Sequence, residues 1–179
     1  MYTREDILNY HCPRWNELPD IDLYMDQVVS LIIKNTSVFS EDDDQRAITK
    51  TMINNYVKLK LIKPPKNKRY DRVHLAYFMV VAILKRFMSL TEIAEGIKQV
   101  KAVYTTQQAY DLFCEIFELS LRSAFDESFE GVKISSLPDE IAIYHAVTSA
   151  YSNMLYARYL ISKKNGVIAD KIKNEDSAN

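Results

Sequence analysis

Residues Thr49–Ile97 read TKTMINNYVKLKLIKPPKNKRYDRVHLAYFMVVAILKRFMSLTEIAEGI. Apolar residues recur every three or four positions on both sides of a Pro-Pro pair, which predicts a short helix, a turn, a basic loop and two further helices. This order of segments is the starting point for the fold that we predict for the whole chain.

The same stretch carries an unusual concentration of positive charge. Between residues 46 and 86 there are eleven cationic side chains and one acidic residue, Asp71, a local net charge of +10. The remainder of the chain has 12 basic and 23 acidic residues, a net charge of −11 that the overall value of −1 conceals. Such a field indicates a polyanionic partner, nucleic acid first. The cations are Arg46, Lys50, Lys58, Lys60, Lys63, Lys66, Lys68, Arg69, Arg72, Lys85 and Arg86.

These segments resemble the DNA-binding head of MerR-type regulators. The matching residues are Tyr56, Leu61, Ile62 and Pro64 after the first helix, Arg69 and Tyr70 at the end of the basic loop, and Ser89, Leu90, Glu92 and Ile93. The phrases WNELPDIDLYMDQV (residues 15–28) and MINNYV (52–57) resemble the bacterial domain-of-unknown-function family numbered 1836, regarded as MerR-like. The latter resemblance covers roughly residues 10–165, and the MerR likeness about 20–100.

The resemblance implies a winged helix-turn-helix, with a supporting helix from Leu23 to about Lys34 and a recognition helix from about Asp43 to Leu59. The polar face of the second helix would carry the DNA contacts. Asparagine matches the acceptor and donor on the major-groove edge of adenine, threonine can contact a thymine methyl group, and lysines hold phosphates. An ordinary solvent-facing helix has the same composition. The candidate residues on this helix are Lys50, Thr51, Asn54, Asn55 and Lys58.

The basic loop after this helix favours the nucleic-acid interpretation. Pro64 and Pro65 stop the helix and stiffen the backbone. The wing would then place Lys66, Lys68, Arg69 and Tyr70 against the adjacent groove or phosphates, where each bound cation releases a counterion. The alternative is a solvated basic loop.

The segment NTSVFSEDDD (residues 35–44) is evidence against simple DNA binding. MerR heads join the two helices by a tight turn, and this acidic connection is several residues longer. Its charge would repel phosphate, or it could cap the next helix, with Ser40 and Asp43 at capping-box spacing.

Composition predicts an all-α protein in a reducing cytoplasm. The chain has 179 residues, 47% of them hydrophobic, with only three Gly and five Pro. No apolar run is long enough for a membrane span, and the first ten residues lack the pattern of a secretory signal. Cys12 and Cys114 suit two buried thiols, although a disulfide between them is possible.

We expect an N-terminal arm at 1–20, a MerR-like domain at 20–102, a helical dimerisation or effector domain at 103–165, and a disordered tail at 166–179. In the arm, Thr3 can cap a short helix, and Trp15 would pin the arm onto the first main helix or anchor a partner. The apolar segment from Asp71 to Phe87 predicts a central core helix, and Ser89 with Glu92 a capping box.

The C-terminal half predicts helices from Gln107 to about Phe125 and from Leu137 to about Lys164, the second ending at Asn165-Gly166. The last helix has two apolar edges. The edge with Tyr144, Tyr151, Leu155 and Tyr159 suits a dimer interface or an effector wall, or equally an intramolecular bundle. The second edge has Ile143, Val147, Ala150, Met154, Ala157 and Ile161.

No phosphate loop, catalytic triad or metal-ligand spacing is present, so we expect neither an enzyme nor a cofactor. The predicted function is a sequence-specific, cytoplasmic transcription regulator that binds double-stranded DNA as a homodimer and responds to an unknown small-molecule effector. The alternative is a helical protein-interaction module whose basic face binds an acidic protein.

Overall fold

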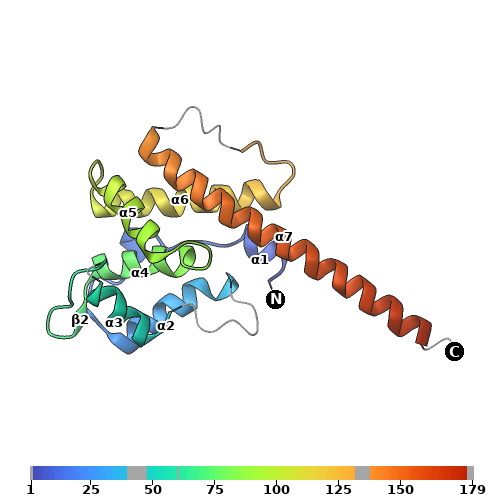
Figure 1. Ribbon diagram of the computed structural model, residues 1–179, viewed down its shortest axis with the longest axis horizontal. Helices are drawn as coiled ribbons and strands as arrows, with labels where there is room; N and C mark the ends of the chain where they lie inside the picture. The colour runs from blue at the N-terminus through green and yellow to red at the C-terminus, as the bar shows by residue number, and fades with distance from the viewer. Residues whose placement is uncertain (1, 40–47, 60, 132–137, 177–179) are drawn as a thin grey trace.

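The computed structural model describes residues 2–39, 48–59, 61–131 and 138–176 (Figure 1). Helices dominate these residues, and the only strands among them form one short antiparallel pair. In chain order the elements are α1 (Arg4–Leu8), the 3-10 turn η1 (Trp15–Glu17), β1 (Leu23–Tyr24), α2 (Met25–Thr36), the 3-10 turn η2 (Ser37–Phe39), α3 (Lys50–Lys58), β2 (Arg69–Tyr70), α4 (Arg72–Leu84), α5 (Leu90–Lys101), α6 (Thr106–Phe125) and α7 (Asp139–Asp176).

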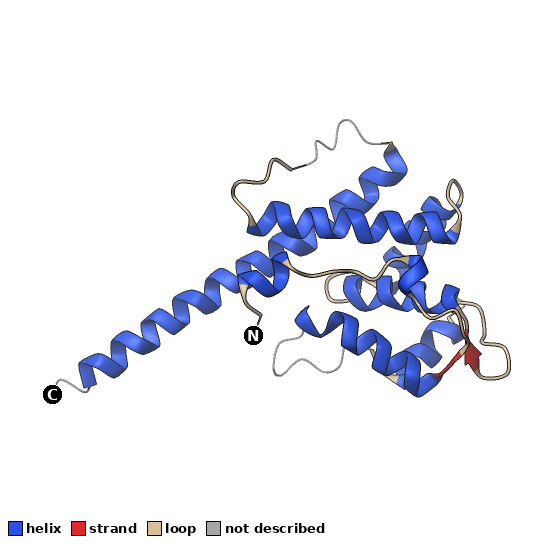
Figure 2. Cartoon of the chain, turned by 180° about the vertical axis from the view of Figure 1, so that it is seen from behind, coloured by secondary structure: helices blue, strands red, loops and turns tan. Residues whose placement is uncertain are grey.

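The molecule is elongated, with α2, α3 and the β1–β2 pair at one end and the last part of α7 projecting from the other (Figures 1 and 2). The helices α6 and α7 pack along one another above α4, and α2 packs below it. One hydrophobic cluster extends through both predicted domains, including Phe39, Phe78, Phe117 and Tyr151. None of the described helices is long and apolar enough to span a membrane.

The prediction of a central core helix is confirmed by α4. Between His74 and Leu84 every side chain except that of Tyr77 is buried. Asp71 precedes the helix and caps it, since its carboxylate accepts from the amide of His74 at 3.1 Å. The predicted caps at Thr3 and at Ser89 with Glu92 are also present.

Two predicted helix boundaries are wrong. Thr49 is extended (φ −127°, ψ 160°) and its hydroxyl accepts from the Met52 amide, so α3 begins at Lys50 rather than near Asp43. The proposed Ser40–Asp43 cap and the acidic cluster lie outside the described residues. The last helix continues past Asn165-Gly166 to Asp176. A glycine that ends a helix adopts a positive φ, and no described glycine has one. Gly166 therefore lowers the stability of α7 without ending it.

The N-terminal arm, residues 2–18, packs mainly on α6. Trp15 packs within the chain and contacts α6 and α4. Its backbone amide donates to Asp111 of α6 at 2.6 Å, and Arg72 of α4 lies over its ring at 5.8 Å. Tyr10 joins the arm to α2, since its hydroxyl donates to the carbonyl oxygen of Asn35 at the end of that helix, 3.1 Å away. The arm therefore connects the first helices to the C-terminal pair.

Glu118 of α6 binds this arm, and we expect it to make the stability of the fold depend on pH. Partial burial raises its pKa, but hydrogen bonds from the Arg14 guanidinium (2.6 and 2.8 Å) and from the Cys12 amide (2.8 Å) outweigh burial and leave the pKa lowered. A carboxylate whose pKa is lower in the folded state stabilises the fold above its unfolded pKa, about 4.3, and loses that contribution as the pH falls through the folded value.

We expect Glu118→Gln to reduce the free energy of unfolding at pH 7 by about 2 kcal/mol, because charge-assisted hydrogen bonds are lost. The deficit relative to the parent should shrink as the pH falls below about 4. Urea unfolding from pH 3 to pH 8 measures both effects. Glu115→Gln on the exposed side of the same helix is the matched control, and a deficit that stayed constant with pH would contradict the assignment.

Candidate nucleic-acid interface

The helix α3 presents a polar face to solvent. Its apolar residues Ile53 and Tyr56 are buried against the protein, which leaves the other side of the helix uncovered. All five residues predicted for this face are exposed, namely Lys50, Thr51, Asn54, Asn55 and Lys58. Their side chains therefore form a continuous surface along α3.

A tight hairpin forms the wing beside α3. The amide of Arg69 donates to the carbonyl oxygen of Lys66 at 2.9 Å, and both intervening residues have positive φ, 51° at Asn67 and 59° at Lys68. Two central residues with positive φ define a type I′ turn, which suits the twist of a hairpin. Asparagine tolerates this conformation, whereas glycine is the usual residue at the second position. The turn leaves Lys66, Lys68 and Arg69 exposed.

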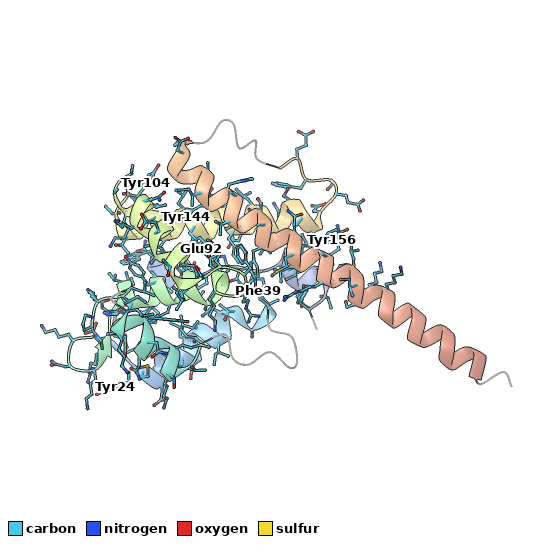
Figure 3. All side chains as sticks on the ribbon, in the orientation of Figure 1. Tyr24, Phe39, Glu92, Tyr104, Tyr144 and Tyr156 are labelled. Atoms are coloured by element: carbon cyan, nitrogen blue, oxygen red, sulfur yellow. The ribbon has the colours of Figure 1, made fainter. Side chains whose placement is uncertain are left out.

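The wing is fastened to the chain ahead of α2. Leu23 pairs with Tyr70 and Tyr24 with Arg69 in the antiparallel β1–β2 ladder. The guanidinium of Arg69 lies 4.5 Å from the centroid of the Tyr24 ring and donates to its hydroxyl at 2.7 Å. Figure 3 shows Tyr24 at the same end of the molecule as α3. Tyr24 was not predicted, and only its exposed position before α2 could have suggested it.

Acidic residues already contact two of the cations. Lys50 forms an ion pair with Asp26 in the first turn of α2. Lys63 lies 2.8 Å from Asp71, whose carboxylate also contacts the buried His74 at 2.6 Å. Burial raises the pKa of Asp71, but Lys63 and His74 outweigh burial and lower it.

Four cations of this surface make no ion pair with a described acidic residue, and one of them, Arg69, has its guanidinium engaged by Tyr24. The other three remain available to a partner. Among the described residues, no ion pair within 4.0 Å involves Lys58, Lys66 or Lys68. Their charge is exposed on α3 and at the wing tip. An anion that approached this end of the molecule would find them without breaking a contact of the fold.

Tyr70 does not belong to this surface. Its side chain is 3% exposed and packs edge-on against His74 at 5.4 Å and beside Phe78 at 5.8 Å. Period-two alternation in β2 points Arg69 outward and Tyr70 into the core. Its prediction as a DNA contact was therefore wrong, since a core ring cannot contact a partner.

The predicted dimer or effector edge of α7 is also largely internal. Tyr144, Tyr151 and Leu155 are buried, while Tyr159 is partly exposed and packs against Phe125. The ring of Tyr151 stacks on Phe117 of α6 at 5.9 Å. Within one chain α6 and the arm already cover this edge, so the intramolecular bundle is the observed arrangement. Among the side chains of α7 that the structure describes, up to residue 164, the exposed large hydrophobic residues are Leu160 and Ile161.

The described residues contain no group of three or more His, Cys, Asp or Glu side chains that could hold a metal ion.

The fold and this surface define an all-α protein with a short two-stranded wing and an exposed, cation-rich helix beside it. Residues 13–113 match the family model described as Domain of unknown function (DUF1836), so the chain belongs to this family. No curated protein matches the chain. No solved structure matches it either.

Proposed function

We propose that this protein is a sequence-specific, DNA-binding transcription regulator of MerR-like type. The observation that carries the proposal is the combination of an exposed Lys, Thr and Asn face on α3 with a hairpin that presents Lys66, Lys68 and Arg69 next to it. The α3 face has the hydrogen-bonding groups that read base edges, and the wing has the charge that holds phosphates.

The proposed mechanism assigns different work to the two elements. Asn54 and Asn55 would enter the major groove with α3, since an asparagine amide can pair bidentately with adenine. The wing cations would follow the neighbouring phosphates and fix the register of the helix. Binding should therefore depend on sequence through α3 and on salt through the wing.

A double variant on α3 tests sequence reading. We expect Asn54→Ala with Asn55→Ala to reduce the preference for enriched genomic fragments over random DNA by about 1–3 kcal/mol for each lost contact, while affinity for random DNA stays the same. Both side chains are exposed, so the variant should fold normally. Competition binding with the two DNA pools measures the preference. Unchanged preference would show that α3 does not read the sequence and would favour the alternative, an acidic protein partner.

The proposal includes a homodimer, since two recognition helices would then read two half-sites of a palindrome. The projecting part of α7 supports it, because Leu160 and Ile161 are 46% and 61% exposed on a helix that extends beyond the body (Figure 1). An effector of unknown chemistry would act by changing the spacing of the two heads.

We expect sedimentation of the parent at micromolar concentration to give twice the mass of one chain. Leu160→Glu with Ile161→Glu should give the mass of one chain, because charges would then lie in the interface. Ala146→Glu with Ala150→Glu, at exposed positions nearer the start of α7, is the control that adds the same two negative charges. A parent that sediments as a single chain would refute the dimer.

A further inference from the structure

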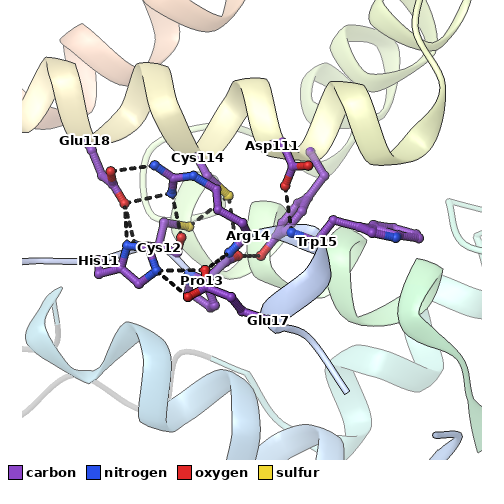
Figure 4. Close-up of polar contacts among 10 residues, drawn as sticks. His11, Cys12, Pro13, Arg14, Trp15, Glu17, Asp111, Cys114 and Glu118 are labelled. Carbon is purple, nitrogen blue, oxygen red and sulfur yellow. Dashed lines mark hydrogen bonds and ion pairs between the residues drawn. The ribbon is translucent and has the colours of Figure 1, made fainter. Parts of the chain in front are cut away.

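Three turns of α6 hold the middle of the N-terminal arm in a fixed register (Figure 4). Tyr110 donates its hydroxyl to the carbonyl oxygen of Pro13 at 2.8 Å, and Glu118 accepts from the Cys12 amide and from Arg14. Residues 110, 114 and 118 are spaced by four and lie on one face of the helix. Position 114, between the two contacts, faces the arm directly.

The two cysteines of the chain meet at this position. The Sγ atoms of Cys12 and Cys114 are 3.1 Å apart, and both residues are fully buried. A disulfide bond is about 2.05 Å long, so the two sulfur atoms need to approach by only about 1 Å. The chain has no other cysteine that could compete for either partner within the molecule.

We propose that Cys12 and Cys114 form a redox-active dithiol that a small-molecule disulfide oxidises, joining the arm covalently to α6. One thiolate attacks the small disulfide, forms a mixed disulfide and releases one small thiol. The second thiolate then attacks the protein sulfur of that mixed disulfide and releases the other small thiol. The two protons of the protein thiols leave on the two released thiols, and the two electrons reduce the small disulfide.

Opening of the arm controls the rate of this exchange. Only a thiolate attacks, and burial raises the pKa of Cys114 well above its ordinary value, so the closed protein presents very little reactive sulfur. The hydrogen bonds from Arg14 and Cys12 to Glu118 keep the arm closed. A small disulfide therefore reaches Cys12 when these hydrogen bonds open. When they form again, the arm returns to α6 and the sulfur of Cys114 lies beside the mixed disulfide.

The test measures the equilibrium between the dithiol and the disulfide rather than the rate of exchange, because burial of the two thiols slows the exchange without changing its equilibrium. The full chain is unfolded in urea and refolded by dilution into a series of reduced and oxidised glutathione mixtures, and the same mixtures are applied in urea. After acid quenching, alkylation and mass spectrometry count free thiols and attached glutathione.

For each state we compare the ratio of reduced to oxidised glutathione at which half of the protein carries the intramolecular disulfide. We expect this ratio to be on the order of a thousandfold higher for the folded protein than for the urea-unfolded chain. This factor follows from the 102-residue separation of the two cysteines, whose loop closure is costly in the unfolded chain. The oxidised protein should also melt roughly 10 °C higher than the reduced protein. The double variant Cys12→Ser with Cys114→Ser should have the same melting temperature after treatment with the oxidising and with the reducing glutathione mixtures.

Equal oxidation in the folded and unfolded states would overturn the proposal, and so would glutathione that stays attached to the folded protein at equilibrium. The single variants Cys12→Ser and Cys114→Ser provide the matched controls, because each keeps one thiol in the same surroundings. The proposal does not depend on the proposed function, and no step of the test involves DNA.

Discussion

Replacing Lys58, Lys66 and Lys68 by glutamine is expected to weaken DNA binding roughly a hundredfold at 0.1 M salt. Each phosphate contact adds about −0.9 to the log–log slope of affinity against salt, so the parent slope of about −4 to −5, for about five contacts, should become about −2. Since these lysines make no described ion pair, the fold should keep its stability. Fluorescence anisotropy with random duplexes from 0.05 to 0.3 M salt measures the slope.

The control is a variant with the same loss of charge placed elsewhere. Lys34, Lys163 and Lys164 are exposed on α2 and α7, away from the wing. Changing all three to glutamine should leave the slope within about one unit of the parent, since none of them is proposed to contact a phosphate. If both triple variants lose affinity alike, net charge rather than this surface controls binding.

A single change at the wing tip separates charge from folding. Lys68 has a φ of 59°, a left-handed conformation that costs a side-chain-bearing residue about 1 kcal/mol. Lys68→Gly should therefore raise the free energy of unfolding while lowering affinity for DNA. A variant that lost both stability and affinity would show that the lysine supports the fold itself.

The largest effect on stability is expected at the aromatic cluster between the arm and the C-terminal helices. The ring of Phe117 is fully buried, and its neighbours lie at centroid distances of 5.8 Å (Tyr10), 5.4 Å (Phe39), 6.0 Å (Phe113) and 5.9 Å (Tyr151). Phe117→Ala should reduce the free energy of unfolding by about 3–5 kcal/mol, because a large cavity would open among four rings.

Urea unfolding of Phe117→Ala beside Phe129→Ala tests this expectation. Phe129 is partly exposed, and Arg122 lies over its ring at 5.7 Å. Its loss should cost about 1 kcal/mol or less, as expected for an exposed cation–π contact. Similar losses in the two variants would mean that the cluster around Phe117 is not the centre of the core.

Local signals in the sequence were sufficient for α4, for the cap of α5 and for the exposed face of α3. The capping pair Ser89 and Glu92 and the apolar run of α4 depend on neighbours within a few residues, and both are present as predicted. The exposed face of α3 follows from the same helical spacing of apolar residues. Helix periodicity alone thus placed five of the candidate DNA contacts on one face.

Two further errors concern contacts between residues distant in sequence. Tyr151 belongs to the core because Phe39 and Phe117 lie beside it, and nothing near position 151 encodes that burial. The arm's place on α6 depends on Glu118 and Asp111, about a hundred residues downstream. Tyrosine suits both an interface and a half-buried site, so composition could not distinguish them.

The placement of the arm determines the order in which the protein can fold as it is synthesised. The hydroxyl of Tyr2 donates to the carbonyl oxygen of Leu155, 153 residues later, and Arg4 donates to that of Phe125. Tyr2 is synthesised long before Leu155, so it finds this partner only when α7 has emerged. Until then the arm can pack on α6, but the hydroxyl of Tyr2 and the face of α6 that α7 covers stay exposed to solvent.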